Sequence, residues 1–234
     1  MHYSIRVQND NYVADKNSIS WQQHNRCLLQ NILNNTLEGT VLFDRISPVY
    51  ALFFNYQIKY YRKILNRMAD VARITPNIEI LDFGCGTGAL SYALWELGAK
   101  VLGVDTSSGM LKQAQKKLGR TGVELIKIAP GQGLPFKDKC FDMVISSFVF
   151  HGLMPEERGW AYRELSRVSR EKIIIHDYND KRSLVTDIAE YLESGDYFNF
   201  IKVAKKEMEG YFNNATMQNV DKRAAWYILE NSSF

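Results

Sequence analysis

Apolar and polar positions follow two different periodicities along this chain, and the change from one to the other predicts its helices and strands. Apolar residues from Phe54 to Leu65 recur at helical spacing within residues 48–73, which predicts an amphipathic helix that ends before Pro76. From residue 78 onward, short β-branched runs alternate with helical stretches. Strands are predicted at 78–83, 100–105, 123–129, 140–150 and 171–178, and helices at 87–98, 107–119 and 155–169.

The last part of the chain changes the alternation. Two more helical stretches lie near 183–193 and 198–211, and residues 214–220 and 224–230 flank a short turn, which predicts an antiparallel hairpin. Strands that alternate with helices form βαβ units, whose parallel sheet is covered by helices. The pattern therefore predicts an α/β fold with one antiparallel hairpin.

The beginning of the chain has a different composition. It is rich in Asn and Gln and has few periodic apolar positions, apart from a short helix predicted near 20–35. We therefore expect an N-terminal extension or cap over residues 1–45 and one main domain over residues 46–234.

Composition narrows the class of protein. The chain is 46% hydrophobic and 24% charged, a composition that is typical of a globular protein. Its net charge of +3 is too small to argue for nucleic-acid binding. The three cysteines are far apart, so neither a disulfide framework nor a metal site is predicted. Because no signal peptide or membrane-spanning run is visible, we expect a cytoplasmic protein; the oligomeric state stays open.

Three glycines lie where the first predicted strand meets the first helix of the alternating region. Gly84, Gly86 and Gly88 allow a tight turn and a close approach of a ligand to the free N–H groups of the helix that follows. The same spacing also fits the dinucleotide pattern GxGxxG/A. The glycines alone therefore indicate a nucleotide-like ligand, or only close packing.

Two carboxylates refine this interpretation. Asp82 ends the first strand, where it would repel a pyrophosphate but could hold an ammonium group. Asp105 ends the next strand, where an acid accepts hydrogen bonds from ribose hydroxyls, although it could instead cap the following helix. Together the two acids favour an aminoacyl nucleoside over a diphosphate.

Three segments carry a family resemblance. ILDFGCGTG, VLGVDTSSGML and LPFKDKCFDMVISSFVFHGL resemble motifs of the class I S-adenosylmethionine-dependent methyltransferases, most closely the group that includes the ubiquinone and menaquinone C-methyltransferases. The resemblance implies a Rossmann-like seven-stranded sheet of order 3-2-1-4-5-7-6 with helices on both faces. It also implies S-adenosylmethionine as the cofactor.

The resemblance assigns roles to residues of the cofactor site. Gly84, Gly86 and Gly88 would hold the methionine and ribose portion, Asp82 would lie near the methionine amino group, and Asp105 would bind the ribose hydroxyls.

The family resemblance fits less well at the part of the cofactor site that would hold adenine. Thr106 follows Asp105, and Met110 would lie against adenine or else form the core face of its helix. Pro130 stands where family members commonly carry an Asp that meets the adenine amino group, and proline has neither a carboxylate nor an N–H. The neighbouring backbone of Gly131, or the amide of Gln132, would have to replace it.

The transferred methyl group would lie near the end of the fourth strand. Ser147 is expected beside the cofactor there, and His151 is our first candidate for a catalytic base. His176 and Asp177 form a second candidate pair at the end of the fifth strand. Tyr178 beside them is a candidate for contact with the substrate.

Aromatic residues precede the first strand. Tyr50, Tyr56 and Tyr60 are candidates for a lid over the site, although such residues at helical spacing are often ordinary core. If they line a pocket, they favour a small, partly apolar acceptor.

Four functions compete at this point. The first is in-line methyl transfer to a small molecule, and the second is S-adenosylmethionine binding without catalysis, for which Pro130 argues. Asp82 argues against the third, an NAD-type oxidoreductase. The fourth, an RNA methyltransferase, lacks a basic stripe or an appended RNA-binding motif.

Overall fold

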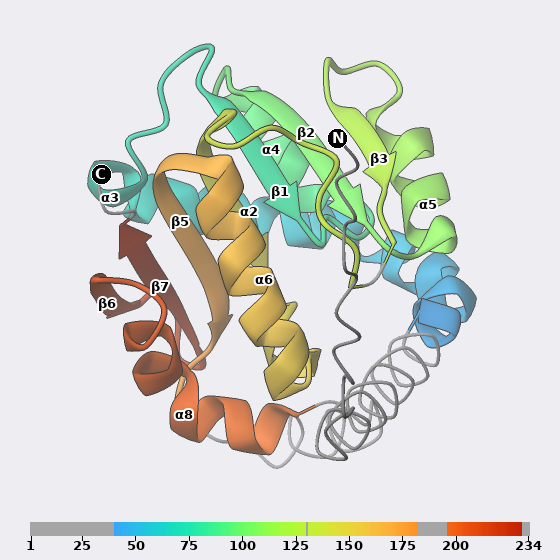
Figure 1. The fold of residues 1–234 in the computed structure, drawn as a ribbon. Coiled ribbons are helices and arrows are strands. Elements are labelled where there is room, and N and C mark those ends of the chain that lie inside the picture. Colours follow the sequence, from blue (N-terminus) through green and yellow to red (C-terminus); the bar gives the residue numbers. More distant parts are fainter. Residues whose placement is uncertain (1–39, 130, 182–195, 231–234) are drawn as a thin grey trace, which may run out of the picture.

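A seven-stranded sheet forms the centre of the computed structural model, which describes residues 40–129, 131–181 and 196–230 (Figure 1). Its order, β3-β2-β1-β4-β5-β7-β6, confirms the predicted order. The first five strands are parallel, and β7 runs antiparallel to both β5 and β6. The strands are β1 (Glu79–Phe83), β2 (Lys100–Asp105), β3 (Glu124–Lys127), β4 (Phe141–Ser147), β5 (Ser169–Tyr178), β6 (Asn214–Asn219) and β7 (Ala224–Glu230).

Helices cover both faces of the sheet, as predicted (Figure 1). Alternate side chains of the central strands enter two cores: Ile80 packs with α2, α3 and α4, whereas Leu81 packs on the other side with α6 and α8. The helices around the sheet include α2 (Phe54–Arg67), α3 (Ala69–Ala72), α4 (Ala89–Glu96), α5 (Ser108–Leu118), α6 (Pro155–Val168) and α8 (Tyr197–Glu209).

Local sequence signals explain where several elements begin and end. The hydroxyl of Ser107 caps α5 by accepting the N–H of Met110, and Pro155 opens α6. The single helix predicted within residues 48–73 is instead interrupted at Phe53 and at Met68, whose backbones leave α-helical geometry. The fourth strand is shorter than predicted, because Phe148 turns the chain with φ +54° after Ser147.

The N-terminal part is described from residue 40, and residues 40–52 are helical. The division into 1–45 and 46–234 stays a prediction. The helices expected near 20–35 and 183–193 lie outside the described residues. Within the described ranges, no helix has both the length and the apolar character needed to cross a membrane.

Candidate functional site

The carboxyl ends of β1, β2 and β4 meet where the sheet reverses its direction of growth. The chain proceeds from β1 to β2 and β3 on one side and then returns to add β4 on the other. Ligands of open α/β sheets bind at such a switch point. Asp82, Asp105 and Ser147 lie at these three strand ends, so the structure brings together residues that were predicted to form one site.

Two of the loop glycines have different surroundings. Gly84 has φ +74°, and a Cβ atom there would lie 2.3 Å from Cγ2 of Val149. Gly86 has φ +54°, but a Cβ atom there would meet nothing within 4 Å. Gly84 therefore allows close packing of the segment after β4, whereas Gly86 borders open space where a ligand can approach the backbone.

The carboxylate of Asp105 is held by the backbone. It accepts the N–H of Gly86 and the N–H of Ser107, each at 2.8 Å. Burial raises its pKa, while these N–H groups oppose the shift. Ser107, not Asp105, is the N-cap of α5. Asp105 is therefore fixed beside the glycine loop with its remaining lone pairs available to hydroxyl groups.

Asp82 is buried under the same loop. Its Oδ2 accepts the hydroxyl of Ser91 at 2.5 Å. Burial is the main cause that raises its pKa to about 7, and the charge of Asp105 adds to the shift. Because a nearby cation favours the charged form of a carboxyl, Asp82 is suited to an ammonium group.

The helical residues 40–52 contact the turn after β2, a contact that sequence reasoning missed. Asp44 Oδ1 accepts the hydroxyl of Ser107 at 2.6 Å and the N–H of Gly109 at 2.7 Å. The hydroxyl of Thr40 lies 3.4 Å from that of Thr106. This segment therefore covers the end of β2 next to Asp105.

His151 and Asp177 form a buried dyad. His151 Nδ1 lies 2.7 Å from Asp177 Oδ1, and Oδ2 accepts the N–H groups of Phe150 and His151. The rings of Tyr178 and Tyr197 lie against the imidazole, with centroids 4.8 and 6.4 Å away. The two candidates at the end of β5, His176 and Asp177, belong to different groups of side chains, because neighbouring residues of a strand point to opposite faces of the sheet.

His176 belongs to another group of side chains. Its Nδ1 lies 3.0 Å from Ser147 Oγ, and its Nε2 lies 3.2 Å from Tyr60 Oη. The hydroxyl of Tyr61 is also 3.0 Å from Ser147 Oγ. Tyr61 was not among the predicted site residues, because helical spacing alone does not show which tyrosine reaches the strand ends.

The other predicted residues lie around this centre. Met110 is buried on α5, and Tyr50 is half-buried. Tyr56 is 72% exposed, so its side chain points away from the strand ends. Gly131 is exposed, with φ +69°, and Pro130 lies outside the described residues. The cofactor and lid roles of these residues stay predictions.

Arg158 was not predicted, although it is fully buried. Its guanidinium donates to the carboxylates of Asp196 and Glu207 and to the carbonyl oxygen of Leu153. These contacts tie α6 to both ends of α8, whose first residue, Tyr197, lies against His151. A buried, paired arginine of this kind has no sequence signal that separates it from exposed arginines.

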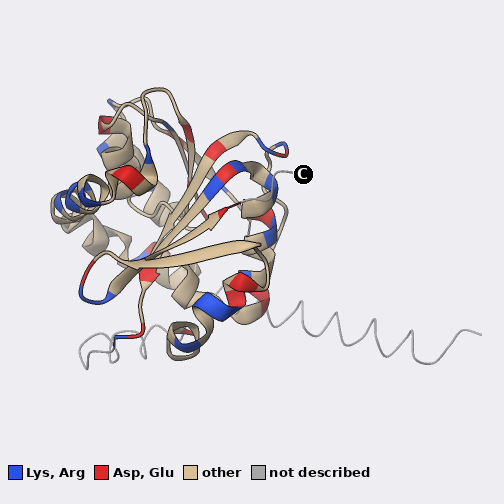
Figure 2. Ribbon diagram, turned by 90° about the vertical axis from the view of Figure 1, so that its left-hand side faces the viewer, with Lys and Arg blue, Asp and Glu red and all other residues tan. Residues whose placement is uncertain are grey.

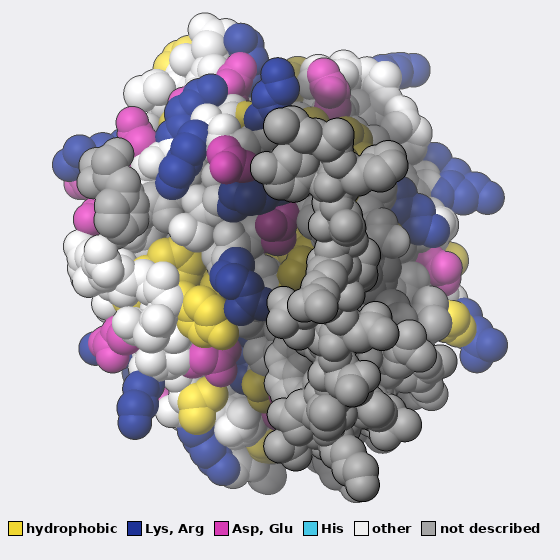
Figure 3. Space-filling model, in the orientation of Figure 1, with side chains coloured by type: hydrophobic (Ala, Val, Ile, Leu, Met, Phe, Trp, Pro, Cys, Tyr) yellow, Lys and Arg dark blue, Asp and Glu magenta, His cyan; other side chains and the backbone are white. Residues whose placement is uncertain are grey.

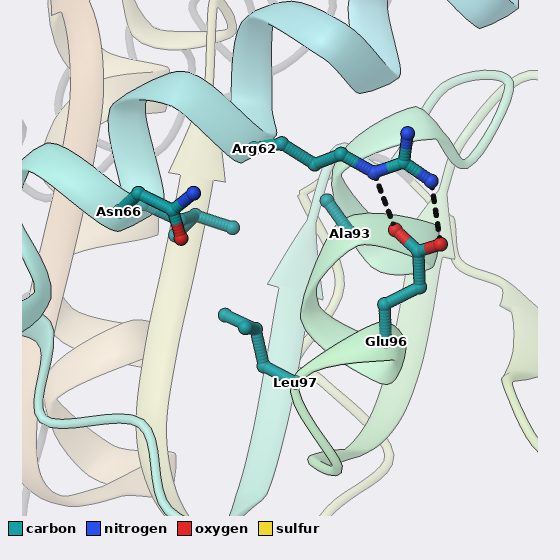
Figure 4. Close-up of a pocket in the computed structure, with 6 residues that line it drawn as sticks. Arg62, Asn66, Ala93, Glu96 and Leu97 are labelled. Atoms are coloured by element: carbon teal, nitrogen blue, oxygen red, sulfur yellow. Dashed lines mark hydrogen bonds and ion pairs between the residues drawn. The ribbon is translucent and has the colours of Figure 1, made fainter.

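A groove between α2 and α4 lies elsewhere. Arg62, Asn66, Ala93, Glu96 and Leu97 line it, and Arg62 forms an ion pair with Glu96 (Figure 4). Since α4 ends at Glu96, just before β2 begins, the groove lies toward the amino ends of the strands, whereas Asp82 and Asp105 lie at their carboxyl ends. It is therefore not the candidate site.

Charges on the surface are mixed. Lysines and arginines are interspersed with aspartates and glutamates along the described elements, and the face seen in Figure 1 shows the same mixture (Figures 2 and 3). Among the described residues, no three His, Cys, Asp or Glu side chains are grouped so that they could hold a metal ion.

The fold and the strand-end acids define a class of protein. A glycine loop after β1, an acid at the end of β2 and a sheet of order 3-2-1-4-5-7-6 are the parts of a class I methyltransferase domain. Residues 81–195 match the family model described as "Methyltransferase domain".

Relatives agree with this class. The chain is 30% identical to an uncharacterized methyltransferase of Geobacillus sp. (strain WCH70) over 73% of this chain and 83% of that protein. It is 40% identical to the malonyl-[acyl-carrier protein] O-methyltransferase of Geobacter sulfurreducens over 51% of this chain and 45% of that protein. It is 36% identical to the demethylmenaquinone methyltransferase of Lactiplantibacillus plantarum over 54% of this chain and 56% of that protein. The chain belongs to the S-adenosylmethionine-dependent methyltransferases.

Solved structures show the same fold. The magnesium protoporphyrin IX methyltransferase of Synechocystis, with bound S-adenosylhomocysteine, matches with a TM-score of 0.54 at 18% identity, covering 75% of this chain and 83% of that chain. A structure from Methanococcus maripaludis matches with a TM-score of 0.63 at 15% identity, covering 82% and 94%.

The residues of this chain fit S-adenosylmethionine. The space beside Gly86 admits a ligand close to the backbone, and the buried Asp82 and the half-buried Asp105 complement an ammonium group and vicinal hydroxyls. The protein is thus a methyltransferase that depends on S-adenosylmethionine, as the sequence predicted.

Proposed function

We propose that this enzyme methylates a small, partly apolar acceptor and that His151 removes the acceptor's proton. The observation that carries the proposal is the 2.7 Å contact between His151 Nδ1 and Asp177 Oδ1 beside the ends of β4 and β5. When bound, the cofactor supplies a methyl group that is already activated on a sulfonium. The protein then has to position the acceptor and manage one proton.

The dyad suits this task. When Nδ1–H donates to Asp177, Nε2 is the basic nitrogen of the imidazole ring and accepts the acceptor's proton. The carboxylate of Asp177 then stabilises the imidazolium. Phe148, Tyr178 and Tyr197 add aromatic surface beside the ring, which supports an acceptor with an apolar portion.

The relatives support the same class of acceptor. Their names refer to malonyl-[acyl-carrier protein] and to demethylmenaquinone. The mixed charges of the surface give no support to the RNA methyltransferase considered above.

A screen of acceptors tests the proposal. Formation of S-adenosylhomocysteine is measured with phenols and quinols, short carboxylic acids, acyl thioesters and an RNA oligonucleotide. With an accepted small molecule, we expect His151→Ala to lower kcat by about 10²–10⁴-fold without changing the affinity for S-adenosylmethionine. Asp177→Asn, which keeps the shape of the carboxyl, should lower kcat less.

Two results would contradict the proposal. If His151→Ala keeps kcat within about twofold of the unmodified enzyme, another group removes the proton. If only RNA is methylated, the acceptor class is wrong.

A further inference from the structure

Two hydroxyl oxygens lie side by side where β4 ends. Tyr61 Oη, from α2, and Ser147 Oγ are 3.0 Å apart. His176 Nδ1 is 3.0 Å from Ser147 Oγ, and Tyr60 Oη is 3.2 Å from His176 Nε2. These four side chains form a hydrogen-bonded chain from α2 through β5 to β4 and back to α2.

The Tyr61–Ser147 pair lies where β4 ends beside the end of β1, because Ser146 is paired with Phe83. Val149, two residues after Ser147, fills the space where Gly84 lacks a side chain, and the hydroxyl of Ser146 donates to the carbonyl oxygen of Phe83 at 2.8 Å. The pair is therefore close to the end of β1, where Asp82 lies.

The negative charges of two acids act on the Tyr61 hydroxyl. Burial is the main cause that raises the pKa of Tyr61, and the negative charges of Asp82 and Asp177 raise it further. Tyr61 therefore stays protonated at neutral pH, near the acid that is suited to the methionine ammonium group and near the dyad of His151.

The chain of hydrogen bonds has a direction. Burial lowers the pKa of His176 to about 4, so its ring is neutral at pH 7, with one nitrogen as donor and the other as acceptor. If Nε2–H donates to Tyr60, then Nδ1 accepts from Ser147, and Ser147 in turn accepts from Tyr61. In that arrangement both hydroxyl oxygens at the strand end present lone pairs, and neither presents a hydrogen atom.

We propose that Tyr61 Oη and Ser147 Oγ face the sulfonium and its methyl group, so that the site prefers the cationic cofactor to the neutral product. The C–H bonds of a methyl group on a positive sulfur are polarised and form hydrogen bonds to oxygen. The thioether of S-adenosylhomocysteine has neither the charge nor the methyl group. His176 is a positioning residue that sets the direction of the chain, and Tyr60 supports it.

Titration calorimetry with the two ligands tests this proposal without any acceptor, so its outcome is separate from that of the proposed function. We expect Tyr61→Phe and Ser147→Ala each to weaken S-adenosylmethionine binding about two- to fivefold while the affinity for S-adenosylhomocysteine hardly changes. Tyr92→Phe is the matched control, because it removes a phenol hydroxyl from a half-buried tyrosine that packs against Phe54 and Trp95. Equal weakening of both ligands, or no weakening of either, would overturn the proposal.

Variants of His176 test its positioning role. The amide oxygen of His176→Asn takes the place of Nδ1 as the acceptor for Ser147 and should keep the preference for S-adenosylmethionine, whereas His176→Leu should lose it. Thermal melts establish that each variant is folded. If the Leu variant does not fold, Tyr60→Phe, which breaks only the outer contact, should still lower the ratio of the two affinities. An unchanged ratio in the folded variants would refute the role of His176.

Discussion

Gly84 and Gly86 are two residues apart and both have positive φ, yet substituting each by alanine should have different effects on stability and on cofactor binding. At Gly84, a Cβ atom would lie 2.3 Å from Val149 Cγ2, whereas at Gly86 it would meet nothing within 4 Å. In both variants, an alanine in the left-handed backbone conformation lowers the free energy of unfolding by about 1–2 kcal/mol. Only Gly84→Ala also forces apart a packed contact, which costs about 1–3 kcal/mol more.

Ligand binding should follow the opposite order. The new methyl group of Gly86→Ala would enter the open space beside the Asp105 carboxylate, where the cofactor approaches the backbone. We expect this variant to bind S-adenosylmethionine about tenfold more weakly or worse, which corresponds to ~1.4 kcal/mol. Its free energy of unfolding should fall by only about 1–2 kcal/mol.

Urea denaturation and titration calorimetry measure the two effects, and a double variant identifies their cause. Val149→Ala removes Cγ2 and leaves Cβ 3.4 Å from the added atom, an ordinary contact. The pair Gly84→Ala and Val149→Ala should therefore be more stable than the sum of the single changes by about 1 kcal/mol or more. Strict additivity would refute the packing explanation. Unchanged cofactor affinity in Gly86→Ala would show that the ligand does not approach there.

Three further predictions concern the acids. Asp105→Ala should weaken cofactor binding by about 1–3 kcal/mol, because ribose hydroxyls lose their acceptor; calorimetry that shows unchanged affinity would mean that the ribose lies elsewhere. The pKa of Asp82 is raised to about 7, and its carboxyl must lose a proton before it can pair with an ammonium group. S-adenosylmethionine should therefore bind about tenfold more tightly at pH 8 than at pH 6. The variant Asp82→Asn should remove this difference. Since the folded state raises this pKa, Asp82 should lower the stability of the ligand-free protein as pH rises from about 4 to 7, measured by urea denaturation with Asp82→Asn as reference.

The fold was largely predictable because strand and helix periodicities differ. Buried parallel strands such as β1 are continuous apolar runs, and Ser107 and Pro155 mark helix starts by their chemistry. The division of the helix at Met68 was not predictable, since no proline or glycine marks it. The early end of β4 was missed for a similar reason: Phe148 adopts φ +54° although its side chain favours an extended strand.

The site was predictable where topology alone decides position. Asp82, Asp105 and Ser147 end strands that are neighbours in a parallel sheet, so they had to meet. The partner of His151 was not predictable, because Asp177 and His176 both lie near the end of β5 and only the pleat of the strand decides which side each faces.

The segment from residue 40 to the end of α2 reaches both ends of the candidate site. Asp44 holds the turn after β2, next to Asp105, and Tyr60 and Tyr61 reach the group at the end of β4. The matched family motif begins only at residue 81, so it describes the loop and the strands but not this cover. Because the cover contacts the turn beside Asp105 through an acid and the end of β4 through phenols, we expect substitutions in it to alter which ligand is bound and those in the strands to alter whether any ligand is bound. The comparison of Tyr61→Phe with Asp105→Ala decides this: the first should change the ratio of affinities for cofactor and product, and the second should weaken both alike.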